Sequence, residues 1–424
     1  MSINRVKIAN SVYFSGITDE RYKTNRISIN LIMPLDKETA SANAIVPSIL
    51  TRGNKSYPDF MKLTKKLHSL YGAVLSNTVG KLGDAQVCTI SISGIDDVYA
   101  LSGEKLTEEM SSILIECLLN PILENGLFSD KNFNLEKNNL IDQIDAEIND
   151  KRTYSINRAS AIMCEDEPYG IGRYGSKQSA EKLTNAMAYD AYKQILSDSR
   201  IEIVFIGCGD YNNARSVFEK AFTGLDRNDA RMPATKLSTP KSEPLTHTEK
   251  MQVNQSKMVL GFKTDCDDVS AMRLMTALYG GTPTSKLFMN VRERLSLCYY
   301  CVARYDRIKG IMLVDCGVEN DNIEKAKDEI LAQLESVKQG DFTDADIEND
   351  KLSLLNSFKT IGDAASAVEG WYVAQIYSGT SFTPEEEGEK LSNIGKDEIV
   401  QAAKSLELDT IYILTGEDSQ EEGE

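Results

Sequence analysis

Histidine and tryptophan are nearly missing from this 424-residue sequence, which has two histidines, His68 and His247, and one tryptophan. Imidazole is a principal zinc ligand, so this scarcity excludes metal sites built from several histidines. The sequence also lacks a Gly-x-Ser-x-Gly motif and a Gly-x-x-x-x-Gly-Lys-Ser/Thr loop. A serine hydrolase of the usual kind and a P-loop nucleotide-binding protein are therefore not indicated.

Positive charge and long apolar runs are also in short supply. Lysine and arginine number 47 against 64 acidic residues, which gives a net charge of −17 and disfavours nucleic acid as a partner. The longest apolar runs, such as 203–206 and 411–414, are strand-sized, whereas a membrane-spanning helix needs roughly 18 or more residues. The first 16 residues contain no apolar stretch typical of a signal peptide. We expect no membrane span and a cytoplasmic location.

The eight cysteines are scattered, and most lie in apolar segments where cysteine behaves as a small buried hydrophobe. Cys298 and Cys301 have the spacing of a Cys-x-x-Cys motif, but they fall on a predicted strand. Residues three apart on a regular strand point to opposite faces, and no second motif completes a zinc site. We therefore predict reduced cysteines without a redox or metal role.

The pattern of apolar residues predicts a duplicated fold. Alternation over 27–34 predicts a strand, helical spacing over 40–50 predicts a helix after it, and the same order of elements recurs beyond residue 244. Long helices are predicted over 131–152 and 343–377. Aligning Phe128-Ser129-Asp130 with Phe342-Thr343-Asp344 places Glu136 opposite Asp350 without a gap. The Pro- and Ser-containing stretch between the halves has no periodicity and predicts a linker.

We therefore expect an α+β fold with two similar domains, each a mostly antiparallel sheet with helices on one face, arranged as a clam shell. The predicted bounds are 1–226 for the first domain, 227–244 for the linker and 245–424 for the second domain.

Two segments carry a family resemblance. Gly280-Gly281-Thr282-Pro283-Thr284-Ser285-Lys286-Leu287-Phe288 leads into Val291-Arg292-Glu293-Arg294-Leu295-Ser296-Leu297-Cys298-Tyr299, and the first half contains Ala44-Ile45-Val46-Pro47-Ser48-Ile49-Leu50-Thr51-Arg52-Gly53. Together they resemble the pitrilysin/insulinase-type metallopeptidases, a family with an inverted zinc motif. The resemblance extends over almost the whole chain.

The resemblance implies that the metal site has been lost. Active members carry His-x-x-Glu-His, in which two imidazoles hold zinc and the glutamate is the general base. Those positions are Ala44, Pro47 and Ser48 here, and the family's distal glutamate ligand is Gln143, although Glu136 is kept. The resemblance therefore predicts no zinc, no other cofactor, no catalytic residue and no peptidase activity of the chain alone. Ala44, Ser48 and Gln143 should lie close together.

Arg292 and Tyr299 match the family's substrate-contacting pair, with Ser296 where the family usually has glycine. By the same resemblance, the strand over 72–78 is expected to pair with an extended peptide. Two-chain members combine a zinc-bearing subunit with one that supplies the Arg/Tyr pair. The sequence thus favours a peptide-binding, non-catalytic subunit of a heterodimeric peptidase. The alternatives are a stand-alone peptide-binding or scaffold protein and a homodimer.

Overall fold

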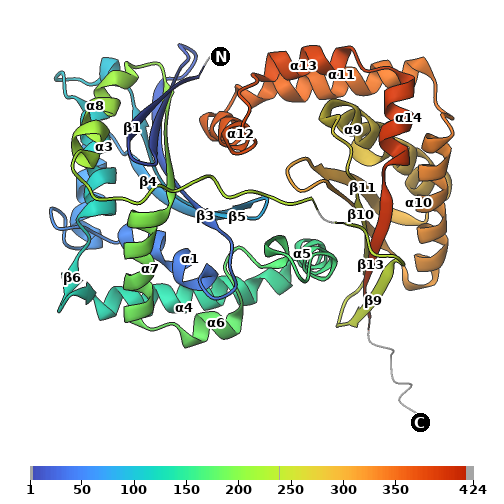
Figure 1. Ribbon diagram of the computed structural model, residues 1–424, viewed down its shortest axis with the longest axis horizontal. Coiled ribbons are helices and arrows are strands. Elements are labelled where there is room, and N and C mark those ends of the chain that lie inside the picture. The colour runs from blue at the N-terminus through green and yellow to red at the C-terminus, as the bar shows by residue number, and fades with distance from the viewer. Residues whose placement is uncertain (1–2, 238, 417–424) are drawn as a thin grey trace, which may run out of the picture. The chain divides into compact units, whose positions relative to one another are not determined.

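The computed structural model describes residues 3–237 and 239–416 (Figure 1). Within these residues the chain forms two compact units, and neither is continuous in sequence. The first unit comprises 1–145, 171–234 and 361–383, and the second comprises 146–170, 235–360 and 384–424. The chain first passes between the units at Asp145–Ala146, and it crosses again at 170–171, 234–235, 360–361 and 383–384.

The first unit is built on a six-stranded sheet in the order β1-β2-β8-β3-β5-β4. All neighbouring strands are antiparallel except β2 and β8. A small hairpin of β6 and β7 is separate from it. The elements of this unit are β1 (Asn4–Ala9), β2 (Val12–Thr18), β3 (Thr24–Pro34), α1 (Ala40–Leu50), α2 (Phe60–Ser69), β4 (Val74–Leu82), β5 (Ala85–Ile95), η1 (Asp97–Tyr99), α3 (Leu106–Leu119), β6 (Leu123–Glu124), β7 (Leu127–Phe128), α4 (Asp130–Ala146), α6 (Lys177–Lys182), α7 (Asn185–Asp198), β8 (Arg200–Gly207), α8 (Tyr211–Phe222) and α12 (Ala365–Tyr377).

The second unit contains a five-stranded sheet in the order β11-β12-β10-β13-β9, again antiparallel except for one pair, β13 and β9. Its elements are η2 (Glu147–Asn149), α5 (Lys151–Met163), η3 (Pro168–Gly170), β9 (Leu245–Lys250), β10 (Ser256–Lys263), α9 (Val269–Thr276), the π-helical η4 (Ala277–Gly281) and η5 (Leu287–Arg294), β11 (Cys298–Asp306), β12 (Ile311–Val318), η6 (Asn320–Asn322), α10 (Ile323–Lys338), α11 (Asp344–Ile361), α13 (Pro384–Ser392), α14 (Lys396–Lys404) and β13 (Glu407–Thr415).

The two sheets have the same topology, which confirms two similar α+β units with mostly antiparallel sheets. Read from one edge, β4-β5-β3-β8-β2 corresponds to β11-β12-β10-β13-β9, and the parallel pair occupies the same place in both. The first sheet has one extra edge strand, β1. The strands β4 and β11 are therefore equivalent edges of their sheets.

Apolar and polar residues alternate along β3, and this alternation determines which face of the first sheet packs against the main helical core. Ile27, Ile29 and Leu31 are fully buried in the core that the helices α1, α3, α7 and α8 share with the sheet. Ser28 and Asn30 point to the other face, as the period of two requires. Figure 1 shows α3 and α8 on one side of this sheet and α12 on the other. The second face is therefore polar but still partly covered.

Each unit takes one helix from the other half of the sequence. The predicted helix over 131–152 ends at Ala146, because η2 follows and Asp150 caps a new helix by accepting hydrogen bonds from the Arg152 and Thr153 amides. The predicted helix over 343–377 breaks after Ile361, at Gly362 and Asp363. Both predictions of a single long helix were wrong, because α5 packs on the second unit and α12 on the first.

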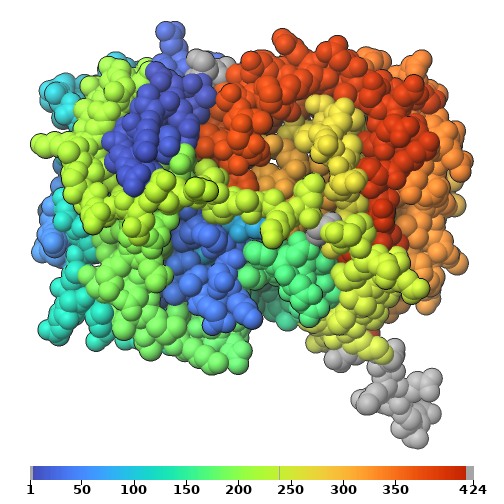
Figure 2. Space-filling model, viewed as in Figure 1, coloured from blue at the N-terminus to red at the C-terminus, as the bar shows by residue number. Residues whose placement is uncertain are grey.

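Charged and polar contacts hold both exchanged helices. Within the first unit, Glu369 of α12 accepts from Arg26 at 2.6 Å and from the Asn30 amide at 3.2 Å. Within the second, Arg152 of α5 donates to Asp315 at 2.5 Å. Figure 2 shows the orange-red surface of the α12 region directly beside the blue surface of the N-terminal strands. Each attachment joins a helix to the sheet of its own unit through at least one partly buried ion pair.

The stretch predicted as a linker contains no helix or strand between Thr223 and Pro244 in its described residues. Its first part is held to the first unit, because Arg227 is buried and donates to the Ser199 carbonyl at 2.5 Å. Burial also lowers the pKa of Arg227 to about 10. In the second unit, Lys241 bonds Asp409 at 3.0 Å. Among the described residues, no helix is long and apolar enough to cross a membrane.

Candidate functional site

Three of the four residues at the lost metal position line one small cavity in the first unit. Ala44 and Ser48 lie on α1, and Gln143 lies on α4. The cavity has a volume of about 60 Å³, and its remaining lining residues are Ile45, Asn77, Thr78, Val79, Glu136, Asn139, Leu140 and Tyr174. The fold therefore brings Ala44, Ser48 and Gln143 together, although they are up to a hundred positions apart in sequence.

Pro47 lies in the same helix but is buried and does not line the cavity. Proline has no amide hydrogen, so the carbonyl of Asn43 has no partner in the next helical turn. The thiol of Cys88 donates to that carbonyl at 3.5 Å. Burial raises the pKa of Cys88 to about 12, so the thiol keeps the proton that it donates. This contact lets α1 continue through a residue that normally interrupts a helix.

Hydrogen bonds within the protein occupy several of the polar side chains around the cavity. Ser48 Oγ donates to Asn77 Oδ1 at 3.1 Å, and Asn77 Nδ2 donates to Thr51 Oγ1 at 2.9 Å. Glu136 accepts hydrogen bonds from Arg52 Nε and, at 3.2 Å, from Asn139 Nδ2. The single carboxylate of the lining is therefore already neutralised by a guanidinium.

This set of donors does not fit zinc. Zinc sites in proteins use thiolates, imidazoles and carboxylates, whereas this cavity offers hydroxyls, amides and one carboxylate paired with Arg52. A divalent cation next to that guanidinium would also be repelled. In the part of the chain that the structure describes, no group of three or more His, Cys, Asp or Glu residues could hold a metal ion. The cavity can instead form neutral hydrogen bonds to a polar ligand.

An edge strand runs beside the cavity. Asn77, Thr78 and Val79 belong to β4, which pairs with β5 on one side and ends the sheet on the other. An unpaired strand edge presents backbone donors and acceptors to any added strand. The segment over 72–78 was predicted to pair with a peptide, and the structure places most of it on this edge strand.

The second unit carries Arg292 and Tyr299 on consecutive elements. Arg292 lies near the end of η5, where its guanidinium stacks 4.7 Å from the centre of the Phe288 ring and approaches Glu293 at 3.6 Å. Tyr299 follows on β11 and is 69% exposed. Within the described residues its hydroxyl has no hydrogen-bond partner. Both side chains therefore retain donors for an external group.

Two positions of the motif, Ser296 and Gly280, have structural explanations. Ser296 has a φ of 49°, in the left-handed region that favours glycine, so the family's glycine has a conformational reason. Gly280 lies where a Cβ atom would come within 2.9 Å of the Ala303 backbone nitrogen and Cβ. Gly280 thus permits close packing of η4 on β11.

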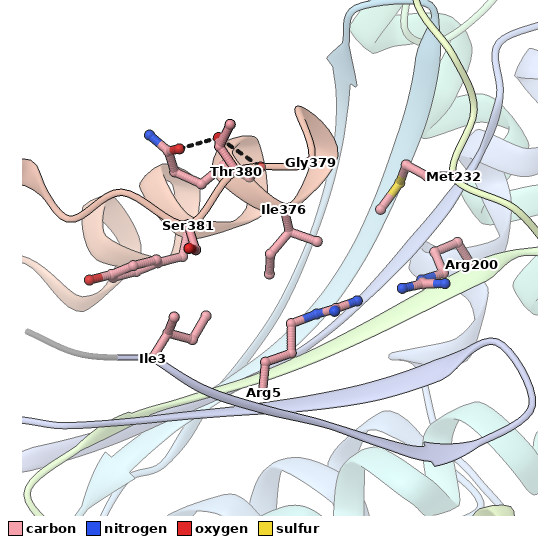
Figure 3. A pocket seen from close by; sticks show the side chains of 10 residues that line it. Ile3, Arg5, Arg200, Met232, Ile376, Gly379, Thr380 and Ser381 are labelled. Atoms are coloured by element: carbon pink, nitrogen blue, oxygen red, sulfur yellow. Dashed lines mark hydrogen bonds between the residues drawn. The ribbon is translucent and has the colours of Figure 1, made fainter. Parts of the chain in front are cut away.

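A second cavity of the first unit, of about 450 Å³, contains a group that the sequence analysis did not single out (Figure 3). Arg5 and Arg200 extend from β1 and β8 opposite the end of α12. Glu202 accepts two hydrogen bonds from Arg5, at 2.7 and 3.0 Å, and one from Arg200, at 2.7 Å. Both guanidiniums stack on Tyr13. The spacing Arg200-x-Glu202 on a strand, which puts both on one face, was the only sequence signal.

The fold and the site define a class: a duplicated α+β peptidase-like chain whose metal position has lost its ligands. Comparisons with known proteins identify the family that this class resembles. Residues 182–354 match the family model described as the peptidase M16 inactive domain. The comparisons therefore confirm the predicted resemblance to the M16, or pitrilysin/insulinase-type, metallopeptidases, and the chain lacks the His-x-x-Glu-His motif of that family.

Relatives and solved structures agree with this assignment. The chain is 29% identical to a probable inactive metalloprotease, YmfF, of Bacillus subtilis over 404 residues, which cover 94% of this chain and 95% of that protein. A conserved protein from Enterococcus faecalis superposes with a TM-score of 0.91 at 27% identity, over 99% of this chain and all of the other. A protease from Helicobacter pylori shares the fold, with a TM-score of 0.79 at 14% identity over 98% of this chain and 99% of that one.

Proposed function

We propose that this chain is the non-catalytic subunit of a two-chain peptidase and that it holds an extended peptide for a homologous zinc-bearing subunit. The observation that carries the proposal is the edge strand β4 beside a cavity with hydrogen-bonding but no metal-binding side chains. Strand addition would supply main-chain hydrogen bonds without regard to sequence. A cytoplasmic location remains a prediction from composition alone.

Arg292 and Tyr299 support the same proposal from the second unit. A guanidinium fork and a phenol can donate hydrogen bonds to a peptide carbonyl and stabilise the negative charge that develops on it during cleavage. Their chemistry needs a nucleophile, which the donor set around Ser48 does not supply. The zinc-activated water would therefore come from the partner subunit.

The test is activity by complementation. The purified chain with added zinc should not cleave a panel of unfolded peptides, whereas a mixture with a His-x-x-Glu-His homologue from the same source should cleave them. Arg292→Ala should reduce the activity of the mixture by about 10²-fold, the scale seen for loss of one charge-stabilising donor. Arg294→Ala is the matched control, because Arg294 lies on the same element and is 62% exposed at its side chain. Cleavage by the chain alone would overturn the proposal.

Peptide binding can be measured separately by fluorescence anisotropy with a labelled extended peptide. A peptide N-methylated at alternate residues, on the edge that faces β4, should lose binding because it cannot donate hydrogen bonds to the strand. The same peptide methylated on the opposite edge should bind as the parent does. Binding without cleavage in every mixture would support the stand-alone peptide-binding alternative, and equal binding of both methylated peptides would exclude strand addition.

A further inference from the structure

The larger cavity of the first unit presents only positive charge, although the whole chain has a net charge of −17. Its lining includes Arg5 and Arg200 and contains no aspartate or glutamate. Glu202, which pairs with both arginines, is fully buried and is not part of the lining. Two guanidiniums and one carboxylate therefore leave a net charge of +1 at this wall.

Contacts within the first unit fix the orientation of both guanidiniums. Each Nε atom donates to Glu202, and the Cζ atoms of Arg5 and Arg200 lie 4.0 and 3.5 Å from the centre of the Tyr13 ring. Among the described residues, neither Nη1 atom donates to an acceptor, and Arg200 Nη2 has no acceptor either. The wall thus keeps oriented donors that suit a carboxylate, which accepts two parallel hydrogen bonds from a guanidinium.

The opposite wall contains a buried amide group without a partner. Gln375 of α12 is 1% exposed, and its Oε1 accepts from Thr380 Oγ1, whereas its Nε2 makes no hydrogen bond within the described residues. The helix end itself is satisfied, because the Gly379 and Thr380 amides donate to the Ile376 and Gln375 carbonyls. A buried donor without an acceptor is uncommon and lowers stability. An acceptor atom of a ligand would complete this group.

Apolar side chains make up much of the remaining lining. Ile3 precedes β1, Met232 lies in the segment after α8, and Ile376 lies on α12. Figure 3 shows Met232 and Ile376 across the cavity from the two guanidiniums. The volume of about 450 Å³ is within the range of small-molecule sites, roughly 300 to 1,000 Å³. A charged wall and an apolar wall on one cavity fit a ligand that has both kinds of group.

We propose that this cavity binds a small carboxylic acid, which no step of the proposed peptidase function requires. Its carboxylate pairs with Arg5 and Arg200, and its aliphatic chain lies against Ile3, Met232 and Ile376. A single negative charge matches the net charge of +1 at the wall, whereas a phosphate dianion exceeds it. An inorganic anion would also leave the apolar wall uncovered. The ligand contacts β1, β8 and α12, so its binding strengthens the attachment of α12 to the first sheet.

Isothermal titration calorimetry of the intact chain with hexanoate tests the proposal. Hexanoate should bind with a stoichiometry of one. 1-Hexanol, which has the same chain without the charge, should bind at least about 10-fold more weakly. Inorganic phosphate, which has charge without the chain, should also bind at least about 10-fold more weakly. No saturable binding of hexanoate, or equal affinity for either comparison compound, would overturn the proposal.

Two variants test the charged wall and the apolar wall separately. Arg5→Gln should weaken hexanoate binding by about 10-fold or more. The matched control is Arg215→Gln, because Arg215 pairs with Glu219 on its own helix and its side chain is 36% exposed; this variant should bind as the unmodified chain does. Met232→Trp, at a half-buried position, fills the cavity and should abolish binding with both arginines intact. This second variant keeps the test decisive if Arg5→Gln fails to fold.

Hydrogen–deuterium exchange locates the bound hexanoate. The amides of 376–381, at the end of α12, should exchange more slowly when hexanoate is present. Protection only around the apolar cavity of the second unit, which Leu355, Phe358 and Gly388 line, would overturn the proposal. Full affinity in folded Arg5→Gln or in Met232→Trp, or an equal loss of affinity in Arg215→Gln, would also contradict it.

Discussion

Asp350 and Glu136 occupy equivalent positions in the two halves but have opposite electrostatic surroundings. Glu136 pairs with Arg52. Asp350 is 3% exposed and accepts one hydrogen bond, from Thr282 Oγ1 at 2.8 Å, and no cation pairs with it among the described residues. Burial raises the pKa of Asp350 to about 6, because removal from water disfavours the charged form. One carboxylate is thus stabilised as an anion and the other is not.

The raised pKa of Asp350 makes a pH-dependent contribution to stability. A carboxyl that holds its proton more tightly in the folded state favours folding below its unfolded pKa, near 4, and loses this contribution as pH rises to about 6. Asp350→Asn, whose amide oxygen can still accept from Thr282, should therefore be more stable than the unmodified chain at pH 7 by up to about 3 kcal/mol. The gain should shrink toward pH 4.

Urea unfolding at pH 4, 5, 6 and 7 measures this difference. Asp328→Asn, at an exposed position of α10, controls for the change in net charge and should show no such trend. A difference between Asp350→Asn and the unmodified chain that does not change with pH would contradict the argument.

At the scale of elements, the turn from η5 to β11 determines where the Arg292 and Tyr299 side chains are presented. Ser296 adopts a left-handed conformation there, and the Leu297 amide bonds the Val291 carbonyl at 3.0 Å. A non-glycine residue in this conformation lowers the free energy of unfolding by about 1 to 2 kcal/mol. Glycine would avoid this cost, but it loses more conformational entropy on folding, which offsets part of the gain. The turn therefore keeps a strained residue where the family usually has glycine.

Ser296→Gly should raise the free energy of unfolding by about 0.5 to 1 kcal/mol, because glycine relieves the left-handed conformation. Ser296→Ala removes the hydroxyl but keeps the Cβ atom, so it should change stability little. Urea unfolding of the three proteins tests this, and equal effects of alanine and glycine would show that strain is not the cause.

At the scale of the whole molecule, the exchange of α5 and α12 makes each unit depend on both halves of the sequence. The helix α12 buries Val368, Tyr372, Val373 and Tyr377, and fully burying one such side chain contributes roughly 1.5 to 3 kcal/mol. Losing several of them approaches the total stability of a typical domain, roughly 5 to 15 kcal/mol. Neither sequence half carries a complete core.

Fragments 1–234 and 235–424 expressed separately should therefore fail to fold cooperatively, whereas their mixture should recover the circular dichroism and unfolding transition of the intact chain. The matched control is the intact chain cleaved after folding at an engineered protease site between Ala234 and Thr235, which should stay folded. Cooperative unfolding of either fragment alone, with the stability of the intact chain, would contradict this expectation.

The sequence pattern predicted a structural feature correctly wherever that feature depends only on residues that are neighbours in the chain. The helix over 40–50 was predicted with its observed bounds. The duplicated α+β fold follows from the repeated periodicity, and the residue types of Ala44, Ser48 and Gln143 show that the metal ligands are missing. Apolar periodicity indicates that a segment has a buried face. Whether a side chain can bind a metal ion depends on its residue type, which the sequence gives directly.

Only the tertiary structure decided which sheet each buried face meets. Periodicity is the same whichever core a helix packs on, so it could not show that the chain crosses between units near Ala146 and Ile361. The bulge in β11 beside Tyr299 depends on pairing with β12, a partner distant in sequence, and it brings Cys298 and Cys301 to one face, so the prediction that they face opposite sides was wrong. Long-range pairing changes the direction of side chains, and local sequence does not encode it.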